Sequence, residues 1–246
     1  MRILYLKFFL SYPNICYKTM ALAFDCRLQT PFNCLVAGPT KSGKTTFTCN
    51  LLKLSGEMFT RKPDYVLLFY MINQPSYEHM LEKGLINEMI DLNSYSVNYE
   101  EIYQRVEPFK NGNGSLIIFD DSMSEIKPGL EKIFTILGHH TNCSLIYLSQ
   151  NLFYNNKTFR NISLNFDYIA LMRNKRDLSQ IKYLAQQLCP GNTKYIIHSY
   201  YAATAKPYGH FVVDCNANSP IELRLRSEIF LTRHPDQTPY TVYLEP

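Results

Sequence analysis

The eight residues 38–45, which read GPTKSGKT, constrain the fold of this 246-residue chain more than any other segment. They fit the pattern G-x-x-x-x-G-K-[ST], in which a glycine-rich loop joins a strand to a helix. The flanking sequence supplies both elements, because residues 34–37 form an apolar run and residues 45–53 have helical character. The chain is therefore predicted to be an α/β protein of the P-loop NTPase class.

Each residue type in this loop has a physical role. Gly38 and Gly43 permit backbone conformations and a close approach that a Cβ would block, so that N–H groups and the helix N-terminus can face phosphates. Lys44 is expected to reach the β- and γ-phosphates of ATP, and the Thr45 hydroxyl to ligate Mg²⁺. The predicted nucleotide-binding residues are Gly38, Pro39, Thr40, Lys41, Ser42, Gly43, Lys44 and Thr45.

A second motif supports the same kind of site. Residues 115–119 read SLIIF and are followed by Asp120 and Asp121. An apolar strand that delivers an acid at its C-terminal end is the Walker B arrangement, so Asp120 is predicted to hold Mg²⁺ and Asp121 to polarise the attacking water. Many ATPases carry glutamate at the second position, and the shorter aspartate leaves the role of Asp121 as a base open.

A third candidate follows the next apolar run, residues 143–149. ATPases with an additional central strand place a polar residue at the tip of that strand, near the γ-phosphate. Gln150 suits this role because an amide both donates to phosphate and accepts from water. The alternative is that Gln150 only satisfies backbone groups of a loop.

Apolar runs alternate with helical patterns along the chain, which predicts a mostly parallel central sheet flanked by helices. Expected strands lie near 33–37, 64–70, 115–120, 143–149, 167–172 and 208–214, and expected helices near 43–54, 76–90, 98–107, 128–138 and 179–188. Residues 1–19 are expected to be an N-terminal appendage or gene-model extension, and residues 20–246 to form one P-loop ATPase domain.

The composition of the chain indicates its cellular compartment and its kind of partner. The net charge of +4, from 25 basic and 21 acidic residues, is compatible with a nucleic-acid partner. Seven cysteines without a C-x-x-C pair argue against a zinc ribbon and for reduced thiols, and thus for an intracellular protein. The apolar stretch at residues 1–10 is interrupted by Lys7 and is too short to span a bilayer, so no membrane partner is expected.

These motifs resemble the DNA-packaging ATPases of the FtsK/HerA superfamily, and in particular the poxvirus-type packaging ATPase carried by Maverick/Polinton elements and related large DNA viruses. The resemblance covers roughly residues 24–232. It is carried by GPTKSGKT (38–45), LIIFDD (116–121), HHTNCSLIYLSQNLF (139–153), FRNISLN (159–165), RNKRD (173–177), PGN (190–192) and KPYG (206–209). It implies a RecA-like core, a homo-oligomeric ring, and ATP-driven movement of double-stranded DNA into a capsid, in a host nucleus or a cytoplasmic viral factory.

A motor of this kind needs an arginine that reaches a neighbour's γ-phosphate and a cationic surface that follows the DNA backbone. Arg160 is the first candidate for the arginine, because the family places its finger just after the sensor strand; Arg173 and Arg176 are alternatives. Each of them also suits a surface salt bridge. The DNA-contacting residues are expected among Lys175, Arg176, Lys182 and Lys194, which equally suit a solvated face.

Two other classes of function stay open. One is a P-loop kinase that phosphorylates a small molecule, for which residues 173–176 would supply a lid; Asp121 and Gln150 instead favour water as the nucleophile. The other is a nucleotide-switched oligomer that binds DNA with little turnover. Stimulation of ATP hydrolysis by DNA distinguishes the three classes.

Overall fold

The computed structural model describes residues 4–10, 18–22, 25–120, 131–153, 157–230 and 241–245. It divides into two compact units. The parallel-sheet unit comprises Arg27–Ala37 and Lys44–Asp167, and the antiparallel-sheet unit comprises Met1–Cys26, Gly38–Gly43 and Tyr168–Pro246. Among the described residues, none of the helices combines the length and the apolar character that a membrane crossing requires.

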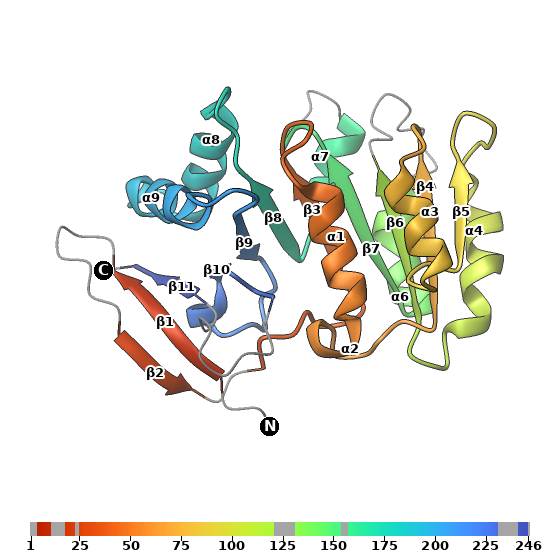
Figure 1. Ribbon diagram of the computed structural model, residues 1–246, viewed down its shortest axis with the longest axis horizontal. Helices are drawn as coiled ribbons and strands as arrows, with labels where there is room; N and C mark the ends of the chain where they lie inside the picture. Colours follow the sequence, from red (N-terminus) through yellow and green to blue (C-terminus); the bar gives the residue numbers. More distant parts are fainter. Residues whose placement is uncertain are drawn as a thin grey trace. The chain divides into compact units, whose positions relative to one another are not determined.

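All five described strands of the parallel-sheet unit run in the same direction. From one edge to the other they are β3 (Asn33–Ala37), β7 (Cys143–Ser149), β6 (Ser115–Asp120), β4 (Tyr65–Tyr70) and β5 (Glu88–Asp91). Strands β6 and β7 are buried at every residue, as expected for continuous apolar runs covered on both faces. The predicted α/β fold with a mostly parallel sheet is thereby confirmed (Figure 1).

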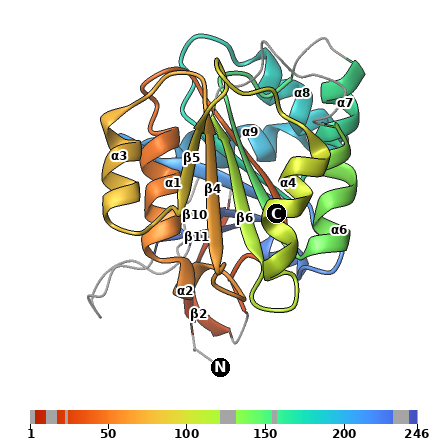
Figure 2. The same cartoon turned by 90° about the vertical axis from the view of Figure 1, so that its right-hand side faces the viewer.

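Helices cover both faces of this sheet. Figure 2 shows α1 and α3 on one face and α4 and α6 on the other. The helical segments of the unit are α1 (Lys44–Lys53), α2 (Ser55–Met58), α3 (Pro75–Glu82), α4 (Tyr99–Val106), η1 (Glu107–Phe109), η3 (Ile133–Leu137), α6 (Gly138–Thr141) and α7 (Lys157–Ser163). The helix expected near 76–90 is wrong at its end, because residues 88–91 pair with β4 as an edge strand.

Strand β7 lies between the two motif strands. In the register of the sheet, Ala37 at the end of β3 pairs with Ser149, and Asp120 at the end of β6 pairs with Leu148. Because parallel strands end at the same edge, the end of β3, the acid of β6 and the tip of β7 are neighbours. This is the additional-strand type expected from the sequence.

Stacked aromatic rings support the end of β6. Phe119, next to Asp120, is fully buried and stacks on Phe69 of β4 with ring centroids 4.9 Å apart. Phe134 packs against Phe119 at 6.0 Å and edge-on against Tyr147 of β7 at 5.7 Å. Aromatic pairs in these geometries add to the stabilisation from buried area, so β4, β6 and β7 are held together directly behind the motif residues.

The antiparallel-sheet unit has a different topology. Its strands are, in order, β2 (Lys18–Leu22), β1 (Leu4–Leu10), β11 (Thr241–Leu244), β10 (Leu225–Ser227), β9 (His210–Asp214) and β8 (Tyr168–Met172). Only the pair of β1 and β11 is parallel among these described strands. The unit also contains α8 (Ser179–Leu188), α9 (Thr193–Ala203) and η4 (Ile221–Leu223).

The expected boundary between residues 19 and 20 falls inside β2, whose pairs with β1 run from Lys18 to Leu22. Strand β1 in turn pairs with β11 through Lys7 to Leu10. The separation of residues 1–19 from a domain of residues 20–246 stays a prediction.

A buried ion pair joins β9 and β10. Arg226 donates from Nη2 to Asp214 Oδ2 at 2.9 Å, and their side chains are only 2% and 3% exposed. A second nitrogen of Arg226 donates to the Cys26 carbonyl at 2.9 Å. Removing one partner would leave an uncompensated buried charge, so both residues are expected to be needed where β9 meets β10.

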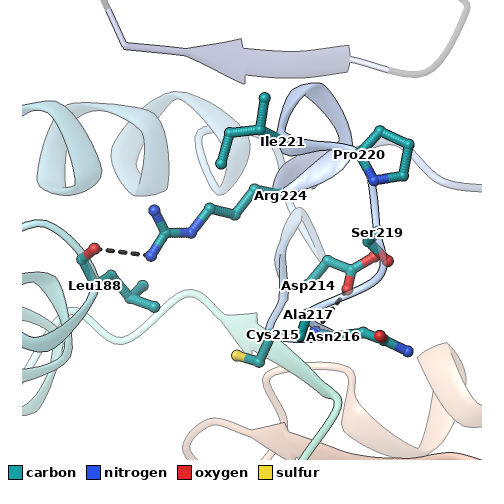
Figure 3. Close-up of a pocket in the computed structure, with 9 residues that line it drawn as sticks. All are labelled: Leu188, Asp214, Cys215, Asn216, Ala217, Ser219, Pro220, Ile221 and Arg224. Carbon is teal, nitrogen blue, oxygen red and sulfur yellow. Dashed lines mark hydrogen bonds between the residues drawn. The ribbon is translucent and has the colours of Figure 1, made fainter.

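Beside this pair lies a cavity of about 300 Å³ (Figure 3). Two of its polar groups are engaged within the protein: Arg224 donates to the Leu188 carbonyl at 2.7 Å, and Asp214 accepts from the Asn216 N–H at 3.0 Å.

His210 should make the stability of the fold depend on pH. Burial lowers the pKa of His210 from its ordinary 6.5 to about 4, and its Nε2 accepts from the Ile229 N–H at 3.4 Å, which requires the neutral ring. In the unfolded chain the imidazole of His210 is protonated below about pH 6.5, whereas in the folded protein it stays neutral down to about pH 4. The free energy of unfolding should therefore fall as the pH drops from about 6.5 to about 4, by on the order of 3 kcal/mol.

Urea unfolding at a series of pH values measures this. The His210→Gln protein should be less stable at pH 7 and show a shallower decline below pH 6.5, while His198→Gln, at an exposed position of α9, should follow the parent protein. Parallel curves for the parent and the His210→Gln protein would contradict the assignment.

Candidate active site

The loop between β3 and α1 has the tight geometry that its sequence requires. Lys41 and Gly43 adopt positive φ angles of 64° and 105°. A Cβ at Gly38 would lie 2.6 Å from the Cβ of Met172 and 2.7 Å from Ser42 Oγ, and a Cβ at Gly43 would lie 2.9 Å from the Tyr208 ring. Neither glycine can therefore carry a side chain without a shift of its surroundings.

The loop also leaves a polar group unused. Ser42 Oγ is buried and has no hydrogen-bond partner in the described part of the chain. A buried hydroxyl without a partner is costly, and a bound phosphate oxygen would satisfy it. The loop thus fits an anionic ligand both by its shape and by its unsatisfied donor.

Helix α1 begins at Lys44, directly after the loop. Its first turn contains no acidic residue, so nothing in that turn neutralises the partial positive charge of the helix N-terminus. Lys44 and Thr45 are half-buried there, and Thr48 Oγ1 donates back to the Lys44 carbonyl at 3.1 Å. The arrangement favours an anion in front of Lys44.

Asp120 is held by two side chains that the sequence reading did not identify. The Tyr77 hydroxyl donates to Asp120 Oδ2, and Gln74 Nε2 lies 3.5 Å from the same oxygen and 2.9 Å from the Tyr77 hydroxyl. Asp120 and Tyr77 are 6% and 2% exposed. These contacts orient a carboxylate, a hard oxygen ligand of the kind that Mg²⁺ prefers.

The path of the chain explains how these partners reach the acid. Strand β4 pairs with β6 so that Tyr70 lies opposite Asp120. The chain leaving β4 then places Gln74 at the N-cap position of α3, with Pro75 at the first helical position. The contacts of Gln74 and Tyr77 to Asp120 span 46 and 43 residues of sequence, so no local pattern marks them.

The structure places some of the other predicted site residues near the loop and the acid, but not all of them. Gln150 is exposed and directly follows Ser149, whose hydroxyl accepts from the Asn151 N–H at 3.1 Å, so it lies at the edge shared with Ala37 and Asp120. Asp121 lies outside the described residues. Arg160 is exposed on α7. The structure thus gathers Lys44, Thr45, Asp120 and Gln150 at one sheet edge.

The alternative arginines belong to the antiparallel-sheet unit. Arg173 follows β8 and donates to the Ala205 carbonyl at 2.9 Å, and Arg176 is exposed. Arg173 therefore has a local structural partner, as a structural arginine would.

A glycine loop, a helix N-terminus and a strand-end carboxylate, separated by one strand, define the class of P-loop ATPases with an additional central strand. The chain belongs to the family described as Poxvirus A32 protein, which matches residues 21–185. The poxvirus-type resemblance read from the motifs is thereby confirmed. No curated protein matches the chain.

Solved structures support the fold. B204, the DNA-packaging ATPase from Sulfolobus Turreted Icosahedral Virus, is similar with a TM-score of 0.52 and 13% identity, over 78% of this chain and 96% of that one. The cytoplasmic domain of the Thermomonospora curvata type VII secretion ATPase EccC gives a TM-score of 0.51 and 13% identity, over 89% of this chain and 27% of that one. At this level of identity the likeness shows the fold.

Removing the Tyr77 hydroxyl should disturb Asp120 without disturbing the core. The Tyr77→Phe protein keeps the ring packing on Tyr70, at 5.8 Å between centroids, and loses the bond to the carboxylate. Since hydrogen bonds to charged groups contribute about 1.5–3 kcal/mol, we expect the Mg²⁺ concentration for half-maximal ATP hydrolysis to rise about tenfold or more.

The measurement is a Mg²⁺ titration of the hydrolysis rate, with Tyr70→Phe as the matched control. Thermal melting should stay within a few degrees of the parent protein. An unchanged Mg²⁺ dependence in Tyr77→Phe would show that Asp120 does not rely on this contact.

Proposed function

We propose that the protein is an ATP-hydrolysing motor that moves double-stranded DNA, and that its role is the packaging of a viral or transposon genome. The observation that carries the proposal is the order β3–β7–β6, which brings Lys44, Thr45, Asp120 and Gln150 to one edge of a sheet in a member of the Poxvirus A32 family. The related fold of B204, a DNA-packaging ATPase, supports it.

The chemistry follows from the residues. The loop N–H groups and Lys44 bind the β- and γ-phosphates of ATP, and the Thr45 hydroxyl and Asp120 are the residues that would hold Mg²⁺, which supplies charge neutralisation between the phosphates. Gln150 orients the attacking water, and Asp121 accepts its proton. Because the transferred group is already activated, most of the rate enhancement comes from positioning and from charge stabilisation.

Charge distribution supports a DNA partner. Residues 173–209, which we call the basic segment, contain six basic residues and one acidic residue, whereas the rest of the chain contains 19 basic and 20 acidic residues. The whole positive charge excess is therefore in this segment. Its cations are exposed: Arg173, Lys175, Arg176, Lys182, Lys194 and Lys206. A surface of this kind binds phosphate backbones without reading bases.

The proposed motor also needs an assembly of subunits, a partner that receives the DNA and a cellular location. We propose a homo-oligomeric ring in which Arg160, exposed on α7, reaches the γ-phosphate held by a neighbouring subunit. Capsid proteins are the proposed receiving partner, and a host nucleus or a cytoplasmic viral factory is the proposed location. A Maverick/Polinton element remains the proposed genomic source.

Duplex DNA should raise the rate of Mg-ATP hydrolysis, and Lys44→Ala should abolish hydrolysis because it removes the charge that meets the phosphates. The Lys182→Ala/Lys194→Ala protein should keep the basal rate and lose much of the stimulation, with the slope of log affinity against log salt falling by roughly 1 per phosphate contact. The Lys83→Ala protein, altered at an exposed lysine outside the basic segment, is the control.

Each outcome separates the classes of function. Hydrolysis without any DNA effect would contradict the motor, and phosphate transfer to a small acceptor would identify a kinase. DNA binding with negligible turnover would identify a nucleotide-switched oligomer.

A composite active site should be revealed by mixing variants. Arg160→Ala should bind ATP and assemble but hydrolyse poorly, because an arginine supplied in trans contributes roughly 10³–10⁵ in rate. Adding the Lys44→Ala protein, which retains Arg160, should restore part of the activity. Steady-state hydrolysis at several mixing ratios measures this, and an absence of rescue with concentration-independent turnover would refute the shared site.

A further inference from the structure

Tyr208 is an exposed aromatic residue that contacts the phosphate-binding loop. The residue is 69% exposed, and its ring Cδ1 lies 2.9 Å from the position that a Cβ of Gly43 would occupy. Both residues belong to the antiparallel-sheet unit. Gly43 immediately precedes Lys44, so this ring stands at the part of the loop whose N–H groups face a bound nucleotide.

The segment that carries Tyr208 is anchored on both sides. Before it, Lys206 forms an ion pair with Glu228 at 2.5 Å, and Arg173 donates to the Ala205 carbonyl at 2.9 Å. After it, the buried His210 ring makes a hydrogen bond to the Tyr208 backbone. These contacts fix the position from which the ring projects.

The backbone at Tyr208 is held in an unfavourable conformation. Its φ of 58° lies in the left-handed region, which bulky residues rarely adopt. The next residue, Gly209, has no room for a side chain, because a Cβ there would lie 2.7 Å from the Ala203 carbonyl oxygen. A glycine at position 208 would relieve the strain. Because a large aromatic residue occupies this position instead, we infer that its ring has a functional role.

The exposure of the ring argues for a ligand. A tyrosine that only supported Gly43 would bury most of its surface, whereas Tyr208 leaves about two-thirds of its own open to solvent. Aromatic rings bind planar bases by stacking, and in a nucleotide the ribose connects the base to the phosphates that the loop would hold.

We propose that Tyr208 is a nucleobase-binding residue, on which the base of the nucleotide held by the loop at residues 38–45 stacks. The assignment rests on the proposed nucleotide binding and extends it, because it adds a contact to the base where the motifs account only for phosphates and Mg²⁺. Stacking accepts any base, so it contributes affinity for nucleoside triphosphates over inorganic polyphosphate.

Calorimetric titration with Mg-ATP and with magnesium tripolyphosphate tests the proposal. In the parent protein ATP should bind more tightly than tripolyphosphate. Tyr208→Ala should weaken ATP binding about 5- to 150-fold and leave tripolyphosphate affinity unchanged, whereas Tyr208→Phe, which keeps the ring, should bind ATP within about twofold of the parent.

Two further variants make the result decisive. Tyr208→Gly removes the ring and relieves the backbone, so it should lose ATP affinity without losing thermal stability. Tyr201→Ala, at an exposed tyrosine of α9, should bind both ligands normally. Equal weakening of ATP and tripolyphosphate in Tyr208→Ala would show that the ring only supports the loop, and unchanged or tighter binding of ATP would also overturn the proposal.

Failure of the underlying function has a separate signature. A parent protein that binds neither ligand would refute nucleotide binding at the loop. A parent protein that binds both ligands equally would leave the loop intact as a phosphate site and refute only the base contact.

Discussion

Strand β7 sets the geometry on which the site depends. Its hydrogen bonds to β3 on one side and β6 on the other fix Ala37, Ser149 and Asp120 at one edge of the sheet. Neighbouring strands lie about 4.8 Å apart, so the loop strand and the acid strand are held about two such steps apart. The tip of β7, where Gln150 follows Ser149, lies between the two strand ends.

Packing and hydrogen bonds around the end of β6 hold Asp120 in one orientation. The stacked rings of Phe69 and Phe119 fasten β4 to β6 immediately behind the acid. Strand β4 then leads into Gln74 and Tyr77, which contact the carboxylate. A carboxylate that is oriented before the metal binds loses little freedom on binding, and this preorganisation is the main way in which such a site gains rate.

The sequence predicted the elements whose signals are local. The glycine loop, the strand before it and the helix after it are encoded by adjacent residues, and the expected strands near 115–120 and 143–149 match β6 and β7. It missed β5 and α9, and it could not give the direction of β8 and β9, because a buried strand is apolar on both faces whichever way its neighbour runs. Tyr77 was missed for a related reason: its contact to Asp120 spans 43 residues of sequence.

The position of the basic residues along the chain determines how the protein should respond to ionic strength. The basic segment, at residues 173–209, belongs to a different unit from Lys44, Asp120 and Gln150. Attraction between exposed cations and a DNA backbone is strongly screened by ordinary salt, whereas charges that are half-buried around a bound phosphate are screened much less. Raising the ionic strength should therefore weaken the proposed binding of DNA more than the binding of the nucleotide, so the two affinities can be changed independently through separate sets of residues.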